Sequence, residues 1–187
     1  MKKLTIEEMH RLSAEAFHEA RKLPLVVVLD NVRSQHNVGA VFRTADAFLI
    51  EAVYLCGISP KPDTLAANND LHKTALGAEQ TVAWRAFGNT MDAVCDLKSR
   101  GYLVLSVEQA QGSISPEQAA EIVQREDMKG VALVLGHEVF GVAQEVVDAS
   151  DGCVEIPQYG TKHSLNVSVT AGIVLYSLAT AMRNRVQ

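Results

Sequence analysis

The sequence predicts an α/β protein with a mostly parallel sheet and helices on both faces. Two observations carry this prediction. Short apolar runs rich in Val, Ile and Leu recur along the chain, and helical stretches separate them. Alternating strands and helices are joined by right-handed crossovers, which make neighbouring strands parallel. With 187 residues, the chain is also long enough to bury one core without disulfides or metals.

The first expected element is an N-terminal helical arm over residues 1–22. Apolar residues recur there at helical spacing from residue 4, Thr5 and Glu8 are placed as a capping box, and Pro24 closes the arm. Residues 23–187 are expected to form a single globular domain. Its predicted strands are 25–30, 52–57, 102–107, 131–136 and 153–157, with a weaker one at 81–87. Its predicted helices are 38–49, 90–100, 116–125, 142–149 and 165–185, and the most loop-like region is 60–70.

Composition narrows the classes of function and location. The net charge is -5, so binding of a polyanion would need a local basic patch. Three widely spaced cysteines indicate neither a disulfide framework nor a zinc site, and a reducing cytoplasm fits them. The histidines lack metal-ligand spacing, and the N-terminus lacks the apolar region of a signal peptide. Residues 164–182 carry no charge, but their polar content favours a helix buried in a core or subunit interface over a membrane span.

Polar residues follow the predicted strand 25–30. Asn37 is a candidate N-cap, Gly39 permits a close approach to the first helical turn, and that turn could hold an anion. Arg43 lies beside the apolar face, three residues before Asp46. Periodicity leaves two interpretations of Arg43 open: a solvated arginine paired with Asp46, or a residue of a site.

Two further polar clusters follow strands, and ligands gather beyond the carboxyl ends of parallel strands. After 131–136, Glu138 is placed to accept hydrogen bonds from backbone amides or to hold a cation, or else to cap a short helix. After 153–157, Ser164 and Asn166 flank Leu165 where the last helix begins. They are placed to bond a ligand or another loop, or else to serve as ordinary N-caps.

Taken in order, three motifs resemble those of the SpoU/TrmH branch of the SPOUT methyltransferases. The motifs are N-x-G-x-x-x-R from Asn37 to Arg43, LVLGHEVFG at 133–141 and IPQYGTKHSLNVSVTAG at 156–172. The match runs from about Leu25 to Leu178, and the spacing from Gly136 to Ile156 and on to Leu165 fits the family pattern.

The resemblance implies S-adenosyl-L-methionine-dependent methylation of a ribose 2'-hydroxyl in tRNA or rRNA, by a homodimer with a C-terminal deep trefoil knot. It implies that Arg43 is the catalytic arginine, helped by Asn37, Glu138, Ser164 and Asn166. The residues expected to line the cofactor pocket are Gly136, Ile156, Leu165 and Ser164. A non-catalytic RNA-binding or ribosome-assembly module and a base methylase remain the alternatives.

RNA binding by an acidic chain needs a local basic surface. The residues expected to form it are Lys2, Lys3, Arg11, Arg21 and Lys22 on the arm, with Arg33 near the site. Packing or dimerisation is an equally open role for the arm.

Overall fold

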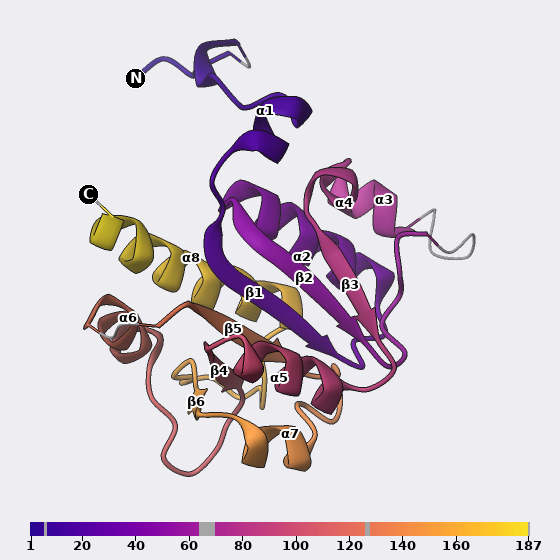
Figure 1. The fold of residues 1–187 in the computed structure, drawn as a ribbon, viewed down its shortest axis with the longest axis vertical. Helices are drawn as coiled ribbons and strands as arrows, with labels where there is room; N and C mark the ends of the chain where they lie inside the picture. The colour runs from indigo at the N-terminus through magenta and orange to yellow at the C-terminus, as the bar shows by residue number, and fades with distance from the viewer. Residues whose placement is uncertain (6, 64–69, 126–127, 187) are drawn as a thin grey trace.

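The chain forms a sheet of six parallel strands in the order β3-β2-β1-β5-β4-β6 (Figure 1). The computed structural model describes residues 1–5, 7–63, 70–125 and 128–186. The strands are β1 (Leu23–Asp30), β2 (Ile50–Cys56), β3 (Trp84–Phe87), β4 (Tyr102–Val107), β5 (Gly130–Leu135) and β6 (Gly152–Val154). The predicted fold class is therefore confirmed for the sheet, and every predicted strand is present with bounds shifted by a few residues.

Strand β1 lies inside the sheet, between β2 and β5. Val28 pairs with Tyr54 on one side and with Val134 on the other. Residues 25–30 are buried, because helices cover both faces of the sheet. This burial explains the continuous apolar runs, since a strand covered on both faces has no solvent side on which polar residues would alternate.

The main helices form two layers (Figure 1). On one face, α2 (Gln35–Ala47), α6 (Pro116–Arg125) and α8 (Val167–Val186) pack into the larger apolar core. On the other, α5 (Thr90–Ser99) and α7 (Gln144–Ala149) pack into the smaller one. The predicted helices on both faces are thus present.

Two short helices were not predicted from the sequence. They are α3 (Asp70–Ala75) and α4 (Ala78–Thr81), which follow the region expected to be a loop. A Cβ atom on Gly39 would lie 2.5 Å from the carbonyl oxygen of Leu71, so the glycine lets α3 pack directly on α2. Residues 64–69 of the expected loop lie outside the described residues.

The arm is not the continuous helix that the apolar spacing predicts. It contains a 3₁₀ turn, η1 (Glu7–Met9), and a short helix, α1 (Ala14–Glu19). The capping box does form, because the Glu8 carboxylate accepts a bond from the Thr5 amide and the Thr5 hydroxyl accepts one from the Glu8 amide. A positive φ at His10 then interrupts the helix, and Ser13 caps a new one. Of the apolar arm residues, Ile6 lies outside the described residues, and Leu4, Met9 and Leu12 are exposed.

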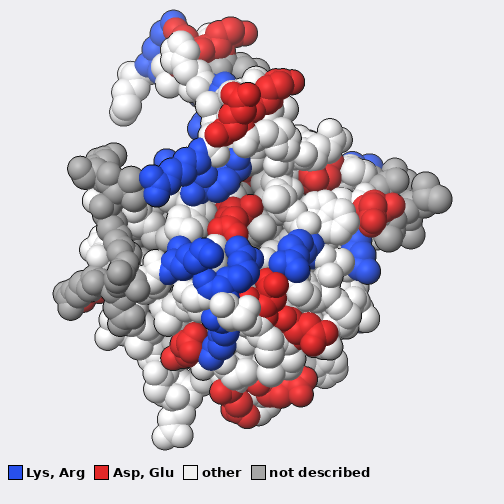
Figure 2. All heavy atoms as spheres, in the orientation of Figure 1, with Lys and Arg blue, Asp and Glu red and all other residues white. Residues whose placement is uncertain are grey.

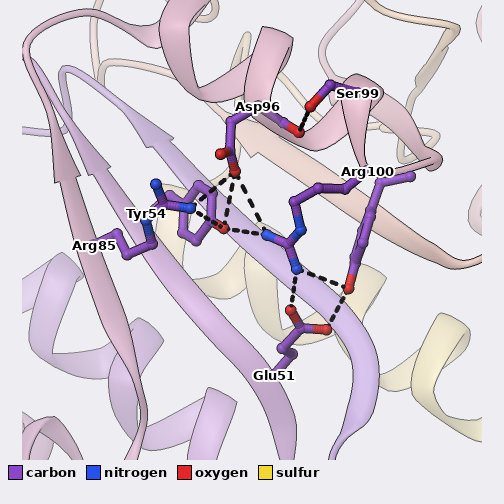
Figure 3. Close-up of polar contacts among 7 residues, drawn as sticks. Glu51, Tyr54, Arg85, Asp96, Ser99 and Arg100 are labelled. Carbon is purple, nitrogen blue, oxygen red and sulfur yellow. Dashed lines mark hydrogen bonds and ion pairs between the residues drawn. The ribbon is translucent and has the colours of Figure 1, made fainter.

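A polar network ties the amino ends of the strands to α5 (Figure 3). The Arg100 guanidinium donates to the carboxylate of Glu51 at 2.6 Å and to the hydroxyl of Tyr54 at 2.6 Å. The Tyr102 hydroxyl also donates to Glu51. Burial, followed by the bond to Glu51, raises the pKa of Tyr102 above its ordinary value. Glu51 and Tyr102 lie near the amino ends of their strands, at the edge opposite the candidate site, so we assign this network to stability.

Helix α8 contains most of the uncharged segment. Within the described residues, no helix is long and apolar enough to cross a membrane. Val174, Leu175 and Leu178 are buried in the core, whereas Val169, Ile173 and Tyr176 are exposed. The exposed three recur at i, i+4 and i+7, so they lie on one side of the helix. The trefoil knot stays a prediction.

Candidate active site at the carboxyl ends of the strands

Three loops meet beyond the carboxyl ends of β1, β5 and β6, and Glu138 joins the first two. Its carboxylate accepts hydrogen bonds from the amide of Arg33 at 3.1 Å and the amide of Ser34 at 2.9 Å. It accepts a third from the side-chain amide of Asn37 at 3.0 Å. The prediction that Glu138 accepts backbone amides is confirmed. The alternative that it caps a short helix is wrong, because α7 begins only at Gln144 and its N-cap is Ala143.

These contacts determine the acidity of Glu138. Partial burial is the largest influence and raises its pKa, but the bonds from Asn37 and from the backbone amides together outweigh it. The net result is a pKa below the ordinary value. Glu138 is therefore a carboxylate at neutral pH, and it stabilises the loop as a charged acceptor.

Asn37 does not have the expected place in its helix. The N-cap of α2 is Ser34, whose hydroxyl accepts from the Asn37 amide at 3.3 Å, so the prediction of Asn37 as N-cap is wrong. The helix begins earlier than predicted, and Asn37 is buried in its first turn. Its side chain is then free to act as a bridge, since its amide donates to Glu138 while its oxygen accepts from Asn166.

Asn166 links this bridge to the last helix. Its side-chain amide donates to the Asn37 oxygen at 3.1 Å. Its own oxygen accepts from the amides of Ser168 at 2.9 Å and Val169 at 3.4 Å, as an N-cap does. Both interpretations of Asn166, helix cap and partner of another loop, are therefore correct. The chain Glu138–Asn37–Asn166 connects residues from all three predicted motifs.

Gly136 begins a tight loop after β5. A Cβ atom on it would lie 2.0 Å from the carbonyl carbon of Gly141, so only glycine fits there. Gly141 itself has φ of +69°, a backbone conformation that side chains disfavour. The amide of His137 donates to the Gly141 carbonyl, and the Gly141 amide donates back to the His137 carbonyl. The loop is closed on itself, with Val139 and Phe140 exposed at its tip.

Two carboxylates that were not predicted as site residues hold the end of this loop. Glu108, just after β4, accepts from the Val142 amide at 3.0 Å. Asp30, the buried last residue of β1, accepts from the Ala143 amide at 2.9 Å. Two successive amides are thus held by acids from the strands on either side of β5. Their positions at strand ends are the one sequence feature that could have indicated them.

A cavity of about 1020 Å³ opens beside these loops. All four predicted cofactor residues line it, together with Glu138 and Asn166; the four are Gly136, Ile156, Ser164 and Leu165. Gly136 is buried, Ile156 is partly buried, and Ser164 and Leu165 are exposed. The cavity is large enough for a nucleoside-sized ligand. The described residues contain no group of three or more His, Cys, Asp or Glu side chains able to hold a metal ion.

Arg43 lies apart from the residues that line the cavity. It is exposed, and within the described part of the chain its side chain has no hydrogen bond or ion pair. The expected pairing with Asp46 is not formed, because the Asp46 carboxylate accepts a bond from the Thr81 hydroxyl at 2.8 Å instead. The structure therefore brings Asn37, Glu138 and Asn166 together but leaves the Arg43 guanidinium available to an external anion.

Comparison with known proteins identifies the family of the chain. Residues 24–176 match the SpoU rRNA Methylase family. The chain is 36% identical over 163 residues to a 23S rRNA (guanosine-2'-O-)-methyltransferase RlmB of Ralstonia nicotianae, covering 87% of this chain and 59% of the relative. It is 30% identical to a tRNA (guanosine(18)-2'-O)-methyltransferase of Aquifex aeolicus, covering 84% of this chain and 70% of that protein.

Solved structures agree with the fold. The A. aeolicus TrmH/SpoU tRNA modifying enzyme superimposes with a TM-score of 0.75 at 28% identity, over 91% of this chain and 81% of the other. An AdoMet-bound rRNA methyltransferase from Sinorhizobium meliloti superimposes with a TM-score of 0.71 at 26% identity, over 90% of this chain and 60% of the other. The chain spans less than two thirds of the length of several of these proteins, including the relative from R. nicotianae.

Proposed function

Because the chain belongs to the SpoU rRNA methylase family, we propose that it transfers a methyl group from S-adenosyl-L-methionine to a ribose 2'-hydroxyl of tRNA or rRNA. One observation carries the proposal: residues of all three motifs, Asn37, Glu138 and Asn166, are hydrogen-bonded in one network at the cavity. The names of the relatives point to the same chemistry on rRNA and tRNA. We propose residues 23–187 as the catalytic domain and residues 1–22 as an arm, in a protein that acts in the cytoplasm.

The cavity has the size and the residues for this cofactor. Gly136, Ile156, Leu165 and Ser164 would hold it, the first three through backbone atoms and apolar contact. Bound there, S-adenosyl-L-methionine supplies an electrophilic methyl group. The donor set suits such a ligand, since the described lining combines apolar side chains with carboxylates and contains neither lysine nor arginine.

Arg43 is the proposed catalytic residue. A guanidinium stays protonated under ordinary conditions, which makes it a poor base but a good partner for an oxyanion. With no intramolecular partner in the described chain and a position outside the cavity lining, Arg43 is available to an RNA phosphate beside the target ribose and to the developing alkoxide. Asn37 and Glu138 act as positioning residues, because they fix the turn from which the helix of Arg43 begins.

The proposed enzyme is a homodimer that uses the exposed apolar side of α8. Val169, Ile173 and Tyr176 are 51%, 39% and 63% exposed, and apolar residues on one side of a long helix favour burial in an interface. We expect light scattering to give a dimer for the wild type and a monomer for Ile173→Asp. A monomeric wild type would contradict the dimer.

RNA contact by the arm is part of the proposal. Figure 2 shows acidic and basic side chains intermingled over the visible face, the arm included, rather than one continuous basic surface. Lys2 already pairs with Glu8 at 3.3 Å, and the Lys22 amine donates to the carbonyl of Ala20 at 3.1 Å. Arg11 and Arg21 on the arm and Arg33 beside the site are exposed, and they are the better candidates for phosphate contact.

The test is methylation of total tRNA and rRNA by the purified chain, with modified positions mapped and nucleosides identified by mass spectrometry. We expect 2'-O-methylated nucleosides. Arg43→Ala should keep cofactor affinity, measured by calorimetry, and lose methylation, while Arg43→Lys should retain a small part of it. Near-normal turnover of Arg43→Ala would overturn the catalytic assignment. Methylated bases would favour the base-methylase alternative, and failure to bind S-adenosyl-L-methionine would favour the non-catalytic module.

A further inference from the structure

The described lining of the main cavity is acidic and lacks compensating cations. Its carboxylates are Glu108, Glu138, Asp148 and Glu155. No lysine or arginine belongs to the described lining. The remaining titratable side chains there are His137 and His163. Lys162 lines a smaller adjoining cavity of about 400 Å³ that shares Ser164, Leu165 and Asn166 with the main one.

Within the described chain, none of these four carboxylates has a cationic partner. Glu108 accepts only from the amides of Gln109 and Val142, and Glu155 accepts from the hydroxyl of Ser113 at 2.6 Å. The Asp148 carboxylate accepts from the side-chain amide of Gln144 at 2.7 Å. Glu138 likewise accepts only from neutral amides. Neutral donors orient a carboxylate without cancelling its charge, so the cavity carries a negative field.

His137 forms no ion pair with these carboxylates within the described chain. Its Nδ1 instead accepts a hydrogen bond from the Val139 amide at 3.0 Å. The described carboxylates do not converge into a group that could hold a metal ion. A lining of this kind suits an organic cation, which needs no converging ligands.

We propose that this acidic lining distinguishes a sulfonium from a thioether, and so favours S-adenosyl-L-methionine over its demethylated product S-adenosylhomocysteine. This inference rests on the proposed function. When the ribose oxygen forms its bond to the methyl carbon, the electron pair of the S–CH₃ bond returns to sulfur, and the hydroxyl proton leaves to solvent. The cavity then holds a neutral sulfur, and the four carboxylates no longer favour the occupant. The lining thus promotes exchange of product for fresh cofactor.

The lining is a specificity determinant rather than a source of catalysis. A negative field stabilises the sulfonium in the ground state more than in the transition state, where the positive charge is already fading. Neutralising the carboxylates should therefore weaken binding of S-adenosyl-L-methionine more than binding of S-adenosylhomocysteine. A purely structural role for Glu108 in holding the loop would instead affect both ligands equally.

The experiment is calorimetric titration of the full chain with each of the two ligands at low and high salt. The test protein is the double variant Glu108→Gln/Asp148→Asn. The matched control is Glu145→Gln. It removes an exposed carboxylate from α7, the helix that contains Asp148, but Glu145 lies outside the cavity lining. Lys162→Gln removes a positive charge beside the cavity instead of a negative one, so it tests a change of opposite sign. Thermal denaturation of each variant shows that it is folded.

We expect the double variant to bind S-adenosyl-L-methionine about fivefold or more weakly than wild type. This fold-change corresponds to ~1 kcal/mol, the interaction energy of two unit charges 4 Å apart in bulk water. Affinity for S-adenosylhomocysteine should change by less than about twofold, Glu145→Gln should change neither, and Lys162→Gln should not weaken sulfonium binding. Equal losses for both ligands, or an unchanged ratio, would overturn the inference while leaving the proposed function intact. If wild type binds neither ligand, the proposed function fails as well.

Discussion

The Glu138–Asn37–Asn166 network makes a sharp prediction for Asn37→Asp. The substitution replaces the amide that donates to Glu138 at 3.0 Å with a second carboxylate. Two unit charges about 4 Å apart repel by ~4 kcal/mol at the effective dielectric of a protein surface, and we halve this because Glu138 is partly exposed. Loss of a hydrogen bond to a charged group adds about 1.5 kcal/mol. The expected loss in free energy of unfolding is therefore about 3.5 kcal/mol at pH 8.

The loss should shrink in mild acid. In wild type the pKa of Glu138 is lowered in the folded state. The stability that the charged Glu138 contributes is therefore complete at any pH above the ordinary carboxyl pKa, and it is lost only as the pH falls through the lower pKa of the folded state. In the variant the two carboxylates share a raised pKa, so the folded state takes up a proton as the pH falls. Only about half of the ~2 kcal/mol of repulsion is relieved before the pH reaches the ordinary carboxyl range, so the loss should decrease to about 2.5 kcal/mol near pH 5.

Urea unfolding of wild type, Asn37→Asp and Asn37→Ala at pH 5 and pH 8 is the assay. Asn37→Ala removes the hydrogen bonds without adding charge, so it should cost about 2 kcal/mol at both pH values. The reasoning is refuted if the aspartate variant loses the same free energy at both pH values, or if it is no less stable than the alanine variant at pH 8.

Three further outcomes are expected. Gly136→Ala should destabilise the fold by about 3 kcal/mol, because its Cβ would overlap the Gly141 backbone, whereas Gly160→Ala, with nothing within 4 Å, should change stability by less than about 0.5 kcal/mol in the same urea titration. Tyr102→Phe should lower the free energy of unfolding by about 1 kcal/mol and leave methylation unchanged, and a loss of turnover would contradict our assignment of that network to stability. Deleting residues 1–20 should reduce the dependence of RNA affinity on salt, and an unchanged slope would exclude phosphate contact by the arm.

Much of the sheet could be predicted because its signal is local. A strand buried on both faces must be apolar along its length, so residues 25–30 and 131–136 are recognisable without their neighbours. Arm residues such as Leu4 and Leu12 show the limit of such patterns. Their spacing fits a helix, but they have no surface to pack against and stay exposed, so the spacing alone did not produce a continuous helix.

The site was predictable where a motif supplied the residues and unpredictable where the contact is remote. Glu138 and Asn166 were expected at the site, and they meet there through Asn37. Asp30 and Glu108 were not expected, since each is an ordinary acid at a strand end whose partner amide lies far along the chain. Such contacts depend on the order of strands in the sheet, which local pattern does not specify.

The position of β1 between β2 and β5 has a consequence for synthesis of the protein. A ribosome completes β1 and β2 early, but β5 lies about 100 residues after β1. At ~5–20 residues per second, one edge of β1 waits roughly 5–20 s for its partner. During this time the apolar nascent chain is open to aggregation or to chaperones. The Glu138–Asn37–Asn166 network forms later still, because it is complete only after Asn166 has left the exit tunnel.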